Sequence, residues 1–429
     1  MIYRFYIPFI LLMGTLYFFK GKKIFVNEIF WLICWWGLVF GTSILSNIYW
    51  GYDISSSTLI YIIAIFILFL VGRYFGKNFN QIRITKREDY HPTKYNFITI
   101  LGFLGTVMFV FDYLHLNGMS TVKSGYNISI IGSLGSLFML ILLVMGLYRF
   151  GYYYYYYKKV DLKSFIYLLA YILPSILNSG RESIFNILIG IFVIKSFCDD
   201  QTVKKRKKIT IKRIVITVTI LFFVIITLMK VYSLTMTRFT NNEVNVFLFR
   251  NKVPNSIINE ANKLGDLKYI YYTILSYFGH QLAFLSCMFH EYSGPYMYGM
   301  FELNILSRRL PKFLGLDYTL VSNTVKYLAN GRFKGDWFTI IGSLIVDFGK
   351  IGALVAIIII GFFVGIMRKR FKISPNIENL SMISLICLSM MSTVQLGPFY
   401  SINIYGAYIW WFLIFNTKIG KIKINYTKE

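Results

Sequence analysis

The chain contains few charged residues for its length. Only 15% of its 429 residues are charged, whereas soluble globular domains carry about 25%, and 56% are hydrophobic, with a mean hydropathy of +0.57. So few charged side chains cannot cover the surface of a soluble body of this size. We therefore exclude a soluble protein and expect an all-α polytopic membrane protein.

Acidic residues and cysteines are also scarce. Nineteen Asp and Glu stand against 45 Lys and Arg, which gives a formal net charge of +26. Such a charge is typical of nucleic-acid binding, but here the cations form short clusters between apolar runs, the pattern that orients membrane proteins. We therefore expect no nucleic-acid partner. The four cysteines form no C-x-x-C pair, which excludes a disulfide framework and a cysteine metal site.

The usual signatures of soluble enzymes are missing as well. The sequence has no G-x-x-x-x-G-K-[ST] loop and no G-x-G-x-x-G pattern, so no nucleotide cofactor is expected. His290-Glu291 begins a zinc-protease pattern, but position 294 is Gly, so the H-E-x-x-H site is absent. We expect neither a metal nor a cofactor.

Long apolar runs recur throughout the chain. A spanning helix needs about 20 mostly apolar residues. By this criterion we predict about eleven spans, near 3–19, 29–50, 57–75, 96–116, 128–149, 164–179, 183–198, 214–232, 349–367, 379–397 and 401–416. The first run ends at lysines rather than at a small-residue cleavage site, so we expect it to stay in the protein as the first span.

Basic loops predict the orientation of these spans. Most Lys and Arg fall in six clusters, at 20–23, 73–94, 149–163, 195–213, 368–372 and 418–428. An even number of spans separates each cluster from the next, so all six can lie on one side. Because Lys and Arg favour cytoplasmic loops, we expect a multi-pass protein of the cytoplasmic (inner) membrane with its N-terminus outside and its C-terminus inside.

This topology divides the chain into three parts. Residues 1–232 form an N-terminal bundle of about eight spans, 233–346 a large extracytoplasmic loop, and 347–429 a C-terminal bundle of about three spans with a basic tail. A connection of roughly a hundred residues usually has its own structure and function. Within it, 269–289 lacks charge, and we expect an interfacial helix there rather than a twelfth span, which would break the charge pattern. We also expect 337–347 to enter the outer leaflet.

Basic residues at the outer face are candidates for binding an anionic headgroup. The outer loop has more cations than carboxylates, and Arg308, Arg309 and Arg332 are among them. Arginine can grip a phosphate through two parallel hydrogen bonds, although a solvated loop in a basic proteome explains the same charges. Arg181, in the turn between two short spans, is a sharper candidate, because an Arg near membrane depth is costly and by default functional. The alternative is an interfacial Arg paired with Glu182.

Three further residues are candidates for proton transfer. Asp347 lies where an apolar stretch enters the membrane, which makes it a candidate base or a carboxylate that orients an Arg. We favour the alternative, in which it is the N-cap of the span that follows. His280 and His290 are the only histidines in the outer loop, and an imidazole can take a proton from a sugar hydroxyl. A buried, hydrogen-bonded histidine is the alternative for each, and we rank His290 behind His280.

Four motifs carry a resemblance to a known family. They are Ser179-Gly180-Arg181-Glu182-Ser183, Ser293-Gly294-Pro295-Tyr296-Met297-Tyr298-Gly299, Gly335-Asp336-Trp337-Phe338-Thr339 and Asp347-Phe348-Gly349-Lys350-Ile351-Gly352. With them, the chain resembles the Wzy-type polymerases, which polymerise the oligosaccharide repeat units of O-antigen and capsule. It is similar to that family in its number of spans, its Gly-Arg turn midway and its one large external loop in the second half.

The resemblance implies a metal-independent glycosyltransferase that works on the outer face of the membrane. Its donor is a growing glycan on undecaprenyl pyrophosphate, and its acceptor is a single lipid-linked repeat unit. Membrane lipids and a polysaccharide chain-length regulator are the further partners it implies. The site residues it implies are Arg181, Arg308, Arg309, Arg332 and Asp336 for substrate binding, and His280 and Asp347 as alternatives for the base. Two other functions stay open, a flippase for lipid-linked oligosaccharides and an O-antigen ligase.

Overall fold

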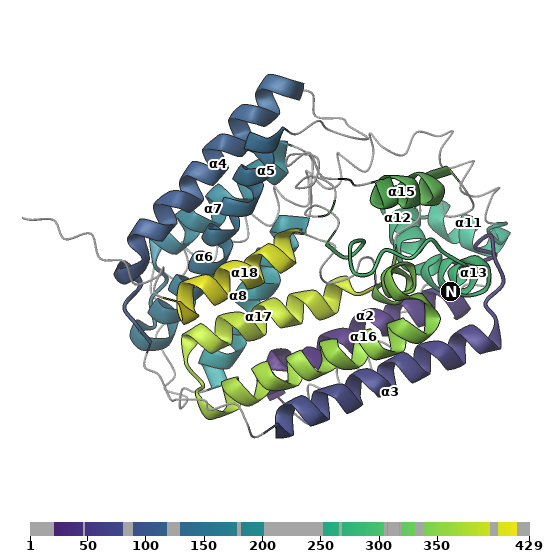
Figure 1. The fold of residues 1–429 in the computed structure, drawn as a ribbon, viewed down its shortest axis with the longest axis horizontal. Coiled ribbons are helices and arrows are strands. Elements are labelled where there is room, and N and C mark those ends of the chain that lie inside the picture. Colours follow the sequence, from purple (N-terminus) through teal and green to yellow (C-terminus); the bar gives the residue numbers. More distant parts are fainter. Residues whose placement is uncertain are drawn as a thin grey trace, which may run out of the picture.

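The computed structural model describes residues 21–45, 48–79, 89–117, 129–177, 182–200, 252–265, 268–303, 307, 317, 319–330, 338–394 and 402–417. Every regular element in these ranges is a helix, and they contain no strand (Figure 1). The predicted spans 3–19 and 214–232 lie outside the described residues.

The helices coincide closely with the apolar runs of the sequence. In chain order they are η1 (Gly21–Val26), α2 (Glu28–Leu45), α3 (Ser56–Asn78), η2 (Pro92–Tyr95), α4 (Asn96–Asn117), α5 (Ile130–Phe138), α6 (Leu140–Tyr157), α7 (Leu162–Leu177), α8 (Glu182–Asp200), α11 (Asn255–Asn262), α12 (Lys268–Gly279), α13 (Gln281–Glu291), α15 (Thr319–Asn330), α16 (Ile340–Ile373), α17 (Ile377–Ser392) and α18 (Ile402–Asn416). One expectation needs correction. The stretch 269–289 is two helices that break at His280, and neither has the length that a membrane span needs.

Four helical stretches are long and apolar enough to cross a membrane, namely Ser56–Asn78, Pro92–Leu116, Ile130–Tyr157 and Ile340–Ile373. Large apolar side chains project from their outer surfaces, such as Ile60 on α3, Val107 on α4 and Ile351 on α16. Lipid tails accept such side chains, whereas water does not. The described residues therefore form a helical, multi-pass membrane protein.

Glycines bring α3 and α16 into backbone contact. A Cβ added at Gly72 would lie 2.2 Å from the carbonyl oxygen of Ile358, and one at Gly76 would lie 2.0 Å from that of Phe362. Gly361, on the facing side, meets the carbonyl oxygen of Phe69 in the same way, at 2.3 Å. Small residues at four-residue spacing allow this close approach in membranes. Because residue numbers rise together along both helices, α3 and α16 run parallel, as Figure 1 shows.

A buried ion cluster joins one end of the bundle. Glu28 opens α2 with a fully buried side chain, and one of its carboxylate oxygens lies 2.6 Å from Arg73 near the end of α3. Arg368, near the end of α16, approaches the other oxygen at 3.9 Å. Nearby, Asp89 accepts backbone N–H groups from Ile377 and Glu378 at the start of α17. We call this end, where α2 and α17 begin and α3 and α16 end, the basic end.

Helices of the long segment after residue 251 gather at the opposite end, which we call the loop end (Figure 1). The Ser43 hydroxyl, near the end of α2, donates to the carbonyl of Gly279 at 2.6 Å. Trp50 packs so closely on Gly279 that a Cβ there would lie 2.0 Å from its ring. The start of α3 contacts His290 at the end of α13. These contacts fix α12 and α13 over the ends of α2 and α3.

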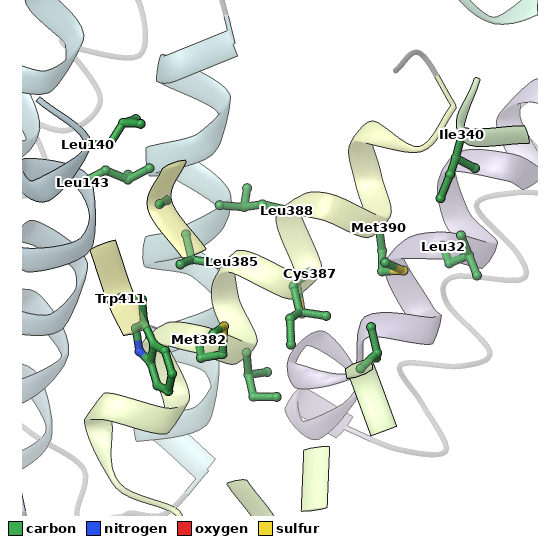
Figure 2. Packing of buried hydrophobic residues seen from close by; sticks show 14 of the residues in the cluster. Leu32, Leu140, Leu143, Ile340, Met382, Leu385, Cys387, Leu388, Met390 and Trp411 are labelled. Atoms are coloured by element: carbon green, nitrogen blue, oxygen red, sulfur yellow. The ribbon is translucent and has the colours of Figure 1, made fainter. Parts of the chain in front are cut away.

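The core surrounds α17, which is buried along almost its whole length. Figure 2 shows Met382, Leu385 and Leu388 of this helix on the side toward α18 and α6, and Met390 toward Leu32 of α2. The indole N–H of Trp411 in α18 donates to the carbonyl of Glu378 at 2.8 Å. Because α17 is buried on every side, its polar residues Glu378, Asn379 and three serines included, it is the centre around which the other helices pack.

Candidate functional site

The backbone of α16 breaks at Gly349, which adopts φ 70° and ψ 179°. Only glycine reaches this region without strain. The preceding turns, from Ile340 to Asp347, are buried inside the bundle. The described part of 337–347 is thus a short buried helix, and the long apolar helix follows the break. That this stretch enters the outer leaflet stays a prediction.

The break frees carbonyl groups that an unbroken helix would use. Two of them find partners in the loop after α13, because Met297 N–H donates to the Val346 carbonyl at 3.2 Å and Tyr298 N–H to the Asp347 carbonyl at 2.8 Å. Helix ends inside a protein need such external partners. Two of the motifs behind the family resemblance, 293–299 and 347–352, are therefore joined backbone to backbone.

The Asp347 side chain strengthens the same junction. One carboxylate oxygen accepts the N–H of Phe301 at 2.8 Å and the other that of Glu302 at 3.0 Å, and the side chain is 0% exposed. The preferred sequence interpretation, an N-cap for the following span, is wrong. The oxygens of Asp347 bind the loop after α13 instead, and Thr339 is the N-cap of the short helix before the break, where it accepts the N–H of Gly342 at 3.2 Å.

Tyrosines surround the junction. A Cβ at Gly349 would lie 3.2 Å from the Tyr296 ring, so the break and the loop pack without a gap. Tyr292 donates its hydroxyl to the Pro295 carbonyl, and burial raises the pKa of this phenol, which keeps it a neutral donor. Tyr298, at 73% exposure, projects away from the protein. The junction thus presents aromatic rings at the loop end.

Beside the junction lies a group of hydroxyls around one imidazole, which we call the hydroxyl cluster: Ser55, Ser57, Thr58, Ser286 and His290. Nε2 of His290 lies 2.7 Å from Ser55 Oγ and 3.3 Å from Ser57 Oγ. Ser286, one turn earlier on α13, accepts the N–H of Ser55 at 3.1 Å and the hydroxyl of Thr58 at 3.2 Å. The cluster combines a potential proton acceptor with groups that bind hydroxyls.

A cation and an aromatic ring connect the cluster to the break in α16. Lys350 Nζ lies 4.7 Å from the ring centroid of Phe289, whose ring contacts that of His290. The Tyr61 hydroxyl donates to the Lys350 carbonyl at 2.6 Å, which holds the start of the long apolar helix against α3. Lys350 itself is exposed.

His280, the first sequence candidate for the base, lies in a different environment. It separates α12 from α13, and its Nδ1 donates to the carbonyl of Ser276 in the preceding turn. Its Nε2 atom is buried. The structure does not test its catalytic assignment or that of Asp347, and both stay predictions.

The substrate-binding candidates Arg181, Arg308, Arg309, Arg332 and Asp336 all lie outside the described residues. Sequence reasoning missed Ser55, Ser57 and Lys350 as members of a site. A clue was present for Lys350, which belongs to the motif 347–352. No clue existed for the two serines, because their partner is more than two hundred residues away.

Within the described ranges, no group of three or more His, Cys, Asp or Glu side chains is placed to hold a metal ion. No family model, no curated protein and no solved structure matches the chain. The class that the fold defines is thus a helical, multi-pass membrane protein with a polar, aromatic site at its loop end.

Proposed function

We propose that this protein is a Wzy-type polymerase, which joins undecaprenyl-pyrophosphate-linked oligosaccharide repeat units into a surface polysaccharide on the outer face of the cytoplasmic membrane. The observation that carries this proposal is the junction at the loop end. Two motifs of the resemblance, 293–299 and 347–352, meet there, because the N–H of Tyr298 donates to the Asp347 carbonyl. Phe301 and Glu302, just after the first motif, donate their N–H groups to the Asp347 carboxylate. Motifs that build one site together are a stronger sign of a shared family than motifs scattered over the surface.

The proposal includes a topology of eleven spans, with the loop end outside the cell. It is supported by the parallel packing of α3 and α16, because the charge pattern assigns both helices the same direction, from outside to inside. It is supported further by the basic end, where Arg73, Arg368 and Lys369 lie together with the helix ends expected in the cytoplasm. The long segment 233–346 is then extracytoplasmic.

The chemistry needs cations and a proton acceptor at the outer face. A hydroxyl of the acceptor repeat unit attacks the anomeric carbon of the donor, and undecaprenyl pyrophosphate leaves with the bonding electrons. Arg181, Arg308, Arg309 and Arg332 are proposed to stabilise the charge that develops on the pyrophosphate, and Asp336 to bind the glycan. Membrane lipids surround the protein, and a chain-length regulator is a proposed partner.

The direct test is polymerisation by the purified protein in liposomes that contain lipid-linked repeat units. We expect a ladder of glycans, its loss in Arg181→Ala, and partial activity in Arg181→Lys, because a lysine lacks the planar fork of the guanidinium. Lys263→Ala, which removes an exposed cation of the segment 233–346, is the control and should polymerise normally. A wild-type protein that moves the lipid-linked units across the bilayer without joining them would be a flippase, and one that transfers glycan only to another acceptor lipid would be a ligase.

A further inference from the structure

We propose that His290 is the residue that accepts the proton of the attacking sugar hydroxyl, and that the spot beside its Nε2 atom is the acceptor hydroxyl subsite. This inference rests on the proposed function and narrows it, because it assigns the base to a residue that sequence reasoning ranked behind His280. It also assigns the chemical class that the hydroxyl cluster binds, an alcohol of a carbohydrate.

The geometry around Nε2 suits a hydroxyl oxygen. Two serine hydroxyls from the start of α3 converge on this one nitrogen, at 2.7 Å for Ser55 and 3.3 Å for Ser57. The shorter distance is ordinary for a hydroxyl that donates to a neutral imidazole nitrogen. A sugar hydroxyl that approaches the exposed His290 ring at a similar distance from Nε2 would be in position to donate its proton.

Helix capping does not explain this contact. Ser55 is the N-cap of α3, and for that role its oxygen needs to accept only the N–H of Thr58, which it does at 3.2 Å. Its hydroxyl hydrogen has three acceptors within reach, Nε2 of His290 at 2.7 Å, Thr58 Oγ1 at 2.8 Å and Ser57 Oγ at 3.0 Å, and His290 is the nearest of them. The imidazole is therefore an addition to a cap that would be complete without it.

The ring is held in place and is also accessible. Ser286 lies four residues before His290 on the same face of α13, is fully buried and binds both Ser55 and Thr58. This anchor fixes the end of α13 against α3, while the His290 side chain itself is exposed. A general base needs both properties, because it must be oriented before substrate arrives and must still be reached by it.

The other two candidates lack one of these properties. Nε2 of His280 is buried, and its Nδ1 already donates to the Ser276 carbonyl. Asp347 is completely buried, and both of its oxygens accept backbone N–H groups. A sugar hydroxyl cannot approach Asp347 without opening the junction at Gly349, and it cannot reach the buried Nε2 of His280 without moving the atoms that cover it.

Proton transfer to His290 is coupled to formation of the new glycosidic bond. The O–H bond of the acceptor breaks and its proton passes to His290 Nε2, while the acceptor oxygen forms a bond to the anomeric carbon of the donor. The bond between that carbon and the pyrophosphate oxygen breaks, and its electron pair leaves with undecaprenyl pyrophosphate. The imidazolium then loses its proton to water.

The test compares His290→Ala with wild type in the liposome assay, with and without added imidazole. Loss of a general base typically lowers a rate by about 100-fold to 10,000-fold, and we expect a fall in that range in kcat. Free imidazole should restore part of the rate, which no structural role of His290 predicts. His115→Ala, an exposed histidine at the end of α4, is the matched control and should keep wild-type activity.

The results for His290→Ala and for wild type test the base assignment and the polymerase function separately. If folded His290→Ala keeps its rate within about threefold of wild type, or loses it without any imidazole rescue, His290 is not the base and the polymerase proposal stands alone. If wild type itself forms no polymer from lipid-linked units, the proposed function fails and this inference fails with it. Melting temperature and gel-filtration elution of the variant, matched to wild type, show that it is folded.

Discussion

The contact between α3 and α16 can be tested by a single methyl group. In Gly76→Ala the new Cβ would lie 2.0 Å from the carbonyl oxygen of Phe362, although such atoms essentially never approach closer than 3.0 Å. The two helices must therefore move apart by about 1 Å along the contact, which costs roughly 1–3 kcal/mol of overpacking. Alanine returns about 0.5–1 kcal/mol because it is a better helix former than glycine. The net expectation is a loss of about 1–2 kcal/mol.

Gly342→Ala is the matched control in the same pair of helices. Its Cβ would meet its nearest neighbours at 3.8 Å, which is ordinary contact, so only the helix-propensity gain remains. We expect Gly76→Ala to melt below wild type and Gly342→Ala to melt at or above it, measured in one detergent by light scattering or intrinsic fluorescence. If both variants melt at the same temperature, the backbone contact between α3 and α16 is not as close as described.

Three other predictions address the junction, the ion cluster and the topology. Asp347→Asn replaces one acceptor oxygen with an N–H donor, so one of the two backbone N–H groups loses its partner, and the melting temperature should fall with a cost of about 1–3 kcal/mol. Glu28→Gln leaves Arg73 and Arg368 without a buried counter-charge and should lower the free energy of unfolding by about 3 kcal/mol. An unchanged melting temperature would show that the ion pair between Glu28 and Arg73 does not contribute to stability. A membrane-impermeant thiol reagent applied to whole cells should label Asn262→Cys but not Lys372→Cys, and the reverse pattern would overturn the outside-facing site.

The sequence predicts most helices because lipid leaves a strong signal. A span must be apolar for about 20 residues, and so α3, α4 and α18 begin and end within a few residues of the predicted limits. Breaks inside apolar stretches leave no such signal. The division at His280 occurs where hydrophobicity continues on both sides, whereas the break at Gly349 coincides with the predicted start of a span. The contacts that stabilise both come from residues distant in sequence.

The candidate site shows the same limit more sharply. Asp347 was recognisable as unusual, because a carboxylate stands where an apolar run begins, yet its partners lie 45 and 46 residues earlier in the chain. Ser55 and His290 are separated by 235 residues, and neither belongs to a motif of its own. Local patterns identify residues that are costly to bury, whereas only the fold shows which of them meet.

The central claim is that this protein polymerises repeat units, and a deletion strain tests it most directly. Lipid-linked and surface-attached glycans from the deletion strain and its parent are compared by gel electrophoresis and mass spectrometry. We predict that single repeat units still reach the surface while polymer is lost, and that the wild-type gene restores the ladder. Polymer of normal length in the deletion strain, or repeat units held on the cytoplasmic side of the membrane, would contradict the account.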